Sequence, residues 1–205
     1  AAEDDDLWIV VKRGGSRYIE HLAPDMLRVE ESNDVANLRF LDCYTEKVEA
    51  TEFTTVAGLE RFNGGEVDTF IDGEPAGLVT VTGGVATLPH PAKNAVVGNP
   101  YTTEVRPTSF DFGAIGSKTA VIELMIRFRN SLGGETSQTR EEGSWSTIQQ
   151  PHPRSTDGTP RPLVSHDFKS TPHSTRGRRT SISVRQTQPL PMTILAMRIT
   201  TNSSK

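Results

Sequence analysis

The sequence has 205 residues, which is enough for one β domain of ordinary size or two small ones. Its net charge of -4 argues against a surface built throughout for nucleic acid, because phosphate binding needs clustered Lys and Arg. It contains no apolar run long enough for a membrane-spanning helix and no signal-peptide pattern, and its single cysteine excludes an intrachain disulfide and a cysteine-based zinc cage.

The first region, residues 1–50, is predicted to hold a hairpin and the start of the main β platform. Residues 7–13 are β-branched and aromatic, residues 17–22 alternate polar with apolar side chains, and Gly14-Gly15 between them is typical of a tight turn. The stretch from Pro24 to Asn37 has no helical period and is expected to be a loop, after which residues 38–44 resume an extended pattern. Cys43 in that pattern is interpreted as a small core residue.

Residues 51–92 are predicted to form a small β subdomain. Short strands are expected at 53–56, 67–71, 78–82 and 85–88, each separated from the next by a glycine signal. The pair Gly83-Gly84 is interpreted as a tight turn and not as a phosphate cradle, because no helix start and no Lys-Ser/Thr follow it. Spacing this regular favours a small antiparallel sandwich or barrel.

The second half is predicted to continue the platform. Strands are expected within 93–134, where Ile122, Leu124, Ile126 and Phe128 fall on one face at a period of two. The hydrophobic content falls in 135–180, which is therefore expected to be a long irregular arm that makes most of its contacts outside its own domain. Two closing strands are expected in 181–205. The predicted fold class is all-β, with antiparallel sandwich or barrel-like subdomains and this arm.

The sequence offers few groups for catalysis. The five histidines do not show the spacing of a metal-binding helix, and neither a nucleophile elbow nor a Walker loop is present. Carboxylates are plentiful, but they are interpreted as solvated strand-face charges. We therefore predict no catalytic, cofactor-binding or metal-binding residues and no enzymatic activity.

The arginines of the 135–180 segment are candidates for an interface. They could contact DNA phosphates or the acidic surface of an adjacent subunit, but no aromatic residues are interleaved with them for base stacking. We therefore favour contact between subunits. The predicted interface residues are Arg154, Arg161, Arg176, Arg178 and Arg179.

Several motifs taken in order resemble the C-terminal portion of tail nozzle proteins, also called tail tubular protein B, of short-tailed double-stranded DNA phages. The similarity covers most of the chain and is poorest over 135–179. The motifs are LWIVVKR with RYIE near the start, VAGLE, DG and VTVTGGV in the subdomain, VGNPY, RNSLGG, and QPLPMTIL near the end.

The resemblance implies a non-enzymatic structural component of a virion tail, made in the host cytoplasm. Six copies would form a ring, DNA would pass through its channel without sequence-specific binding, and adaptor and fibre proteins would be partners. Family members are longer, and the chain begins with Ala1, so we expect a processed product or a fragment.

Two other classes of function stay open. A carbohydrate- or receptor-binding β module of a virion tail would present an aromatic platform built from Trp8, Tyr101 or Trp145. A polysaccharide-degrading enzyme would need two carboxyl groups facing each other across a cleft.

Overall fold

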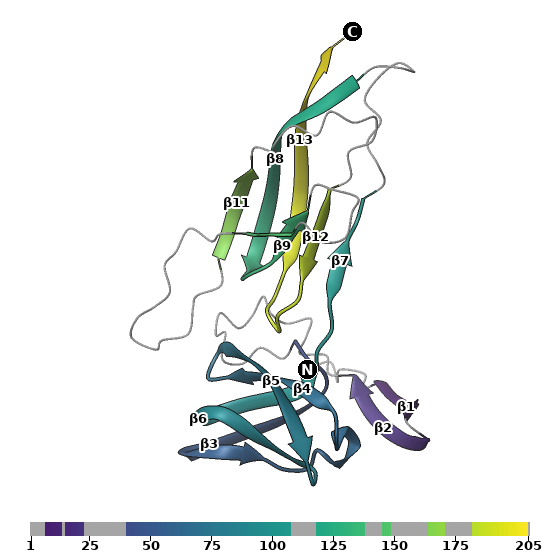
Figure 1. The fold of residues 1–205 in the computed structure, drawn as a ribbon, viewed down its shortest axis with the longest axis vertical. Coiled ribbons are helices and arrows are strands. Elements are labelled where there is room, and N and C mark those ends of the chain that lie inside the picture. The colour runs from purple at the N-terminus through teal and green to yellow at the C-terminus, as the bar shows by residue number, and fades with distance from the viewer. Residues whose placement is uncertain are drawn as a thin grey trace, which may run out of the picture. The chain divides into compact units, whose positions relative to one another are not determined.

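The structure is a computed structural model that describes residues 7–13, 15–22, 40–107, 118–137, 145–148, 164–170 and 182–204. Across these residues the elements are β-strands, apart from one short 3-10 turn, and every strand pairing is antiparallel (Figure 1). The predicted all-β fold is confirmed. The chain divides into two compact units, residues 1–99 and 100–205.

A separate hairpin opens the first unit. Strand β1 (Leu7–Arg13) pairs with β2 (Ser16–Leu22) from Leu7↔Leu22 to Arg13↔Ser16. Gly15 adopts a φ of 94°, a conformation that is inexpensive only without a Cβ. The hairpin predicted from the glycine pair and the alternation is confirmed.

The rest of the first unit is one sheet that closes on itself. It contains β3 (Asp42–Val56), the 3-10 turn η3 (Glu60–Phe62), β4 (Glu66–Ile71), β5 (Glu74–Thr82) and β6 (Val85–Asn99). The strand order is β3-β6-β4-β5, and β6 also pairs with β5. This second pairing joins the ends of the β6-β4-β5 segment and makes the unit barrel-like.

Two tight turns hold the closed sheet. Asp72 and Gly73 have φ values of 48° and 88°, and Gly83 and Gly84 have values of 61° and 76°. Positive φ at both central residues is the pattern of a two-residue hairpin turn whose twist matches that of the flanking strands. The interpretation of Gly83-Gly84 as a tight turn is confirmed.

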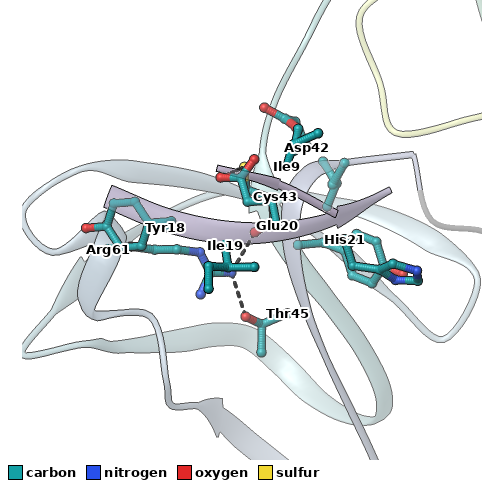
Figure 2. A pocket seen from close by; sticks show the side chains of 11 residues that line it. Ile9, Tyr18, Ile19, Glu20, His21, Asp42, Cys43, Thr45 and Arg61 are labelled. Atoms are coloured by element: carbon teal, nitrogen blue, oxygen red, sulfur yellow. Dashed lines mark hydrogen bonds between the residues drawn. The ribbon is translucent and has the colours of Figure 1, made fainter. Parts of the chain in front are cut away.

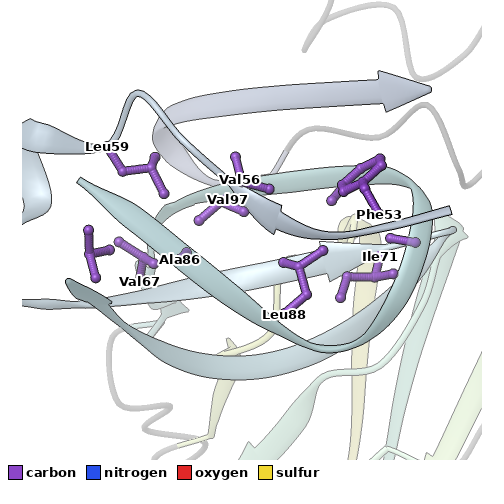
Figure 3. Close-up of a cluster of buried hydrophobic side chains, with 11 residues drawn as sticks. Phe53, Val56, Leu59, Val67, Ile71, Ala86, Leu88 and Val97 are labelled. Atoms are coloured by element: carbon purple, nitrogen blue, oxygen red, sulfur yellow. The ribbon is translucent and has the colours of Figure 1, made fainter. Parts of the chain in front are cut away.

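The core of the first unit fills the inside of this sheet. Figure 3 shows apolar side chains from several strands pointing into the space between the ribbons. Leu59, just before η3, is fully buried, and its backbone N–H donates to the Gly84 carbonyl. The buried members are Phe53, Val56, Leu59, Val67, Ile71, Val81, Ala86, Leu88, Ala92, Ala95 and Val97.

The strand β6 corrects one expectation. The sequence predicted one strand at 85–88 and separate strands within 93–134, whereas β6 is continuous from Val85 to Asn99. The prolines at 89 and 91 fit because they lie where the pairing with β3 is irregular, between Thr55↔Thr87 and Phe53↔Ala92. Proline is tolerated in a strand where its missing N–H is not needed by the ladder.

The second unit is a sandwich of two sheets. One has the order β11-β8-β13, formed by β8 (Lys118–Ser131), β11 (Val164–Ser170) and β13 (Thr193–Ser204). The other has the order β10-β9-β12-β7, formed by β7 (Thr103–Val105), β9 (Glu135–Ser137), β10 (Ser146–Thr147) and β12 (Ser183–Gln186). Both sheets contribute to one core, which includes Leu124, Ile126 and Phe128 of β8 with Val184 of β12.

Part of the predicted arm belongs to this sandwich. Strands β9, β10 and β11 all lie within 135–180, and each pairs with a strand of the same unit. Ile148 is buried in the core, and Phe168 packs against it. For these residues the expectation of contacts mainly outside the domain is wrong, because isolated apolar side chains in a polar segment still find a place in the core.

The division into units also differs from the predicted one. Strand β3 runs through position 50 and β6 through position 92, so the proposed boundaries fall inside strands. The division after Asn99 instead follows the end of β6. A boundary placed inside a long strand has no turn or loop residues to mark it in the sequence.

Gly98 is expected to be intolerant of a side chain. A Cβ there would lie 2.8 Å from the Asp42 carbonyl oxygen, 3.0 Å from the Leu41 Cβ and 3.0 Å from the Tyr44 Cα. Because two of these atoms are backbone, Gly98→Ala should lower the free energy of unfolding by about 1–3 kcal/mol. Urea denaturation measures it, with Gly64→Asn as the control, since that turn position is open and Asn tolerates positive φ. Equal losses in both variants would contradict the argument.

The buried carboxyl of Asp68 makes stability depend on pH. Burial raises its pKa above the ordinary value of 3.8, although the hydrogen bond from the Thr69 N–H opposes part of this rise. The folded state then holds the proton more tightly than the unfolded state, so the contribution of Asp68 to stability falls as pH rises above about 3.8. Urea denaturation at several pH values should show Asp68→Asn gaining stability relative to the unmodified protein between pH 4 and 7. Thr87→Ser, which changes an exposed uncharged residue of the same unit, should show no such trend.

Candidate functional site

One face of the β1–β2 hairpin exposes a row of large apolar side chains. Residues paired directly across the hairpin share a face, so Trp8, Val10 and Ile19 lie together. They are 60%, 69% and 74% exposed, respectively. We call the following set the hairpin face: Trp8, Val10, Lys12, Arg17, Ile19 and His21.

The hairpin face also carries two features that mark a contact surface. Trp8 lies against the His21 ring at a centroid distance of 4.6 Å, which fixes a broad aromatic surface at one end. Lys12 lies directly across from Arg17 near the turn. Like charges opposite each other destabilise a strand pair. An anionic neighbour would therefore stabilise this end of the hairpin.

The hairpin also borders a pocket at the start of β3, and residues from both of its faces line this pocket. The pocket has a volume of about 520 Å³, and its lining includes Tyr18 and Glu20 of the hairpin with Asp42, Cys43 and Tyr44 of β3. Figure 2 shows Tyr18, Glu20, Asp42 and Cys43 around the hairpin ribbon. Two tyrosines and two carboxylates around a cavity give both stacking surfaces and hydrogen-bond acceptors.

Arg61 fixes the position of β3 at this pocket. Its guanidinium donates to the Thr45 hydroxyl at 2.8 Å and to the Cys43 carbonyl (Figure 2). It also donates to the Gly58 carbonyl at 3.1 Å. It also lies over the Phe62 ring, 4.3 Å from the centroid. A planar guanidinium presents five donors in a fixed fork, so Arg61 bonds these acceptors at once and joins η3 to the start of β3.

Cys43 departs from its predicted role as a core residue. It is half-buried, lines the pocket and has a φ of 52°, which is uncommon outside glycine. Its thiol donates to the Glu20 carboxylate at 3.2 Å and thereby joins β3 to the hairpin. Sequence alternation alone does not reveal a change of backbone direction at one residue.

The second unit presents charged side chains on its strands. Arg127 of β8 makes two hydrogen bonds to the Asp167 carboxylate of β11, at 2.8 Å and 3.0 Å, and these lower the pKa of Asp167. Arg185 of β12 bonds Glu135 at 2.7 Å and lies 4.0 Å from the Trp145 ring centroid. These pairs connect strands within the unit.

The residues expected from sequence have different outcomes. The predicted interface residues Arg154, Arg161, Arg176, Arg178 and Arg179 lie outside the described residues. Of the aromatic platform candidates, Trp8 and Tyr101 are exposed, whereas Trp145 packs under Arg185. Trp8 belongs to the first unit and the other two to the second.

Sequence reasoning missed the pocket. Asp42 and Glu20 belong to no sequence motif that indicates a binding site. Arg61, which follows a glycine turn, belongs to none either. In the described part of the chain, no group of three or more His, Cys, Asp or Glu side chains is placed to hold a metal ion. Nor does that part contain a helix long and apolar enough to cross a membrane.

Comparisons with models of known protein families and with curated proteins found no match. The geometry of the hairpin face and of the pocket therefore carries the functional argument, together with the motif resemblance.

The single cysteine makes the pocket testable by thiol labelling. Glu20→Gln should raise the rate at which Cys43 reacts with an anionic aromatic disulfide severalfold, because it removes the charge that repels both the thiolate and the reagent. The absorbance of the released thiolate measures the rate. Glu66→Gln, a neutralisation elsewhere in the same unit, should leave it unchanged. Equal rates for the Glu20 variant and the unmodified protein would contradict the contact.

Proposed function

We propose that this chain is a non-enzymatic structural subunit of the tail of a short-tailed double-stranded DNA phage. In this proposal, copies of the chain assemble into part of a nozzle through which DNA passes. The observation that carries it is the hairpin face, where Trp8, Val10 and Ile19 are all more than half exposed. Exposed apolar surface of this kind is typical of protein interaction sites.

The architecture supports a mechanical role. Both units have buried cores surrounded by antiparallel strands, and strands far apart in sequence are paired, as in β8 with β13 and β3 with β6. Cross-strand pairing of this extent resists shear without requiring any active site. The motif resemblance to tail nozzle proteins agrees with such a role.

The charge balance suits a channel for DNA. Each phosphate that a protein neutralises adds affinity through counterion release, so a strongly basic lumen would hold the genome in place. The net charge of -4 favours weak contact with the DNA backbone. Adaptor and fibre proteins would then bind other surfaces of the ring.

A carbohydrate- or receptor-binding module of a virion tail is the second candidate. The pocket favours it, because Tyr18 and Tyr44 could stack on a sugar while Glu20 and Asp42 accept bonds from its hydroxyls. This candidate needs no assembly of the chain, which separates it from the first.

Electron microscopy and light scattering of the purified chain test the proposal. We expect closed rings, and we expect Val10→Asp combined with Ile19→Asp to release monomers, because the two carboxylates would be buried in the contact. Leu78→Asp is the matched control, since Leu78 of β5 is 56% exposed but lies outside the hairpin face. Circular dichroism should show the same β-sheet signal in every variant.

A monomer at all concentrations would overturn the assembly proposal. If that monomer also bound glycans on an array, and if Tyr18→Ala abolished the binding, the second candidate would replace the first.

A further inference from the structure

We propose that the hairpin face docks onto strand β3 of the next copy of this chain. The inference rests on the proposed function, because it names the surfaces through which the subunits associate. It is drawn from the charges and exposure of two separate surfaces on the first unit. Since these surfaces differ, the contact would be head-to-tail, the arrangement that produces rings.

The hairpin face supplies an apolar centre with a cationic end. Val10 and Ile19 form its middle, and Lys12 and Arg17 lie opposite each other toward the turn. If two copies met through the same hairpin face, these cations would face each other or would have no anion to pair with. A partner surface with carboxylates beside an apolar side chain fits the hairpin face better.

Strand β3 offers such a surface. Val48 is 63% exposed, and the exposed residues Glu46, Glu49 and Glu52 lie close to it along the strand. We call Glu46, Val48, Glu49 and Glu52 the acidic strip. The one cation in this stretch, Lys47, is engaged within the chain by Glu49, the Thr55 carbonyl and the Phe53 ring.

The irregular pairing of β3 makes the acidic strip prominent. Val48 pairs with Asn94, and the next pair along is Phe53 with Ala92, so residues 49–52 have no partners on β6. All of residues 48–52 are exposed. Such a bulge projects side chains out of the sheet plane, where a neighbouring copy can reach them.

The hairpin is attached to its own chain through the bond from Cys43 to Glu20. Ile19 and His21 of the hairpin face also line the pocket at the start of β3. Trp8, Val10 and Ile19 nevertheless stay 60%, 69% and 74% exposed, so the hairpin face is open to a second molecule. Anionic lipid is the competing partner for an apolar surface with cations, but it would give no role to the acidic strip.

Charge reversal on the full chain tests the pairing of surfaces. Lys12→Glu with Arg17→Glu makes the hairpin variant, and Glu46→Lys with Glu52→Lys makes the strip variant. Each alone should associate at least about tenfold more weakly than the unmodified chain, because like charges then meet at every contact. Sedimentation velocity measures the association constants.

Mixing the two variants should restore rings. An acidic hairpin would then meet a basic strip, and a basic hairpin would meet an acidic strip, in alternation around the ring. Restoration also shows that both variants are folded. Lys169→Glu with Arg198→Glu, which makes the same charge change on exposed residues of the second unit, should assemble normally.

The other outcomes separate this inference from the proposed function. Rings formed by each variant alone would overturn the docking assignment and leave the nozzle proposal standing. Two variants that both lose assembly and are not rescued by mixing would also overturn the assignment. A monomeric unmodified chain would overturn both proposals, and tight binding of that monomer to vesicles containing phosphatidylserine, lost in the hairpin variant, would assign the hairpin face to membranes.

Discussion

The first unit depends on the ability of one strand, β6, to pair with three others. It joins β5 at its start, β4 near its end and β3 along much of its length. Its pairs with β5 and its pairs with β4 lie on opposite sides of the irregular stretch that contains Pro89 and Pro91. Together these pairings bring Val67, Val81 and Val97 into one core.

The same strand determines where the pocket lies. Close approach of β6 to the start of β3 at Gly98 holds Asp42 and Tyr44 in place, and Arg61 fixes the adjoining Cys43 and Thr45 from the side of η3. The hairpin is attached to this part of β3 through Glu20, whose carboxylate accepts a hydrogen bond from the Cys43 thiol. A two-stranded hairpin is marginal on its own, so its attachment to a rigid sheet is what makes its exposed face a defined surface.

Much of the fold could be predicted from local patterns, since alternation located β1, β2 and β8, and residue pairs that contain glycine located the tight turns. These signals are local because turn chemistry and side-chain direction involve neighbouring residues only.

The sequence could not show that β6 continues through two prolines or that Ile148 joins a core formed by β8 and β12, because both depend on partners distant in sequence. The pocket was missed for the same reason: Glu20, Cys43 and Arg61 meet only through tertiary contacts. Trp8 was named only as one candidate for the aromatic platform of the carbohydrate-binding alternative, and its companions on the hairpin face emerge only from the strand register.

The position of β3 bears on the proposed docking, because this strand could associate with another copy either through its edge or through its side chains. This strand lies at one end of the β3-β6-β4-β5 order, and an exposed strand of such length would be a template for unlimited strand addition. Its bulge and its charges, with Lys47 held against Glu49, oppose that route. The charges that block edge pairing also give the strand an acidic surface. A partner with cations beside an apolar centre can use that surface without adding a strand, so protection against aggregation and selective docking can come from the same residues.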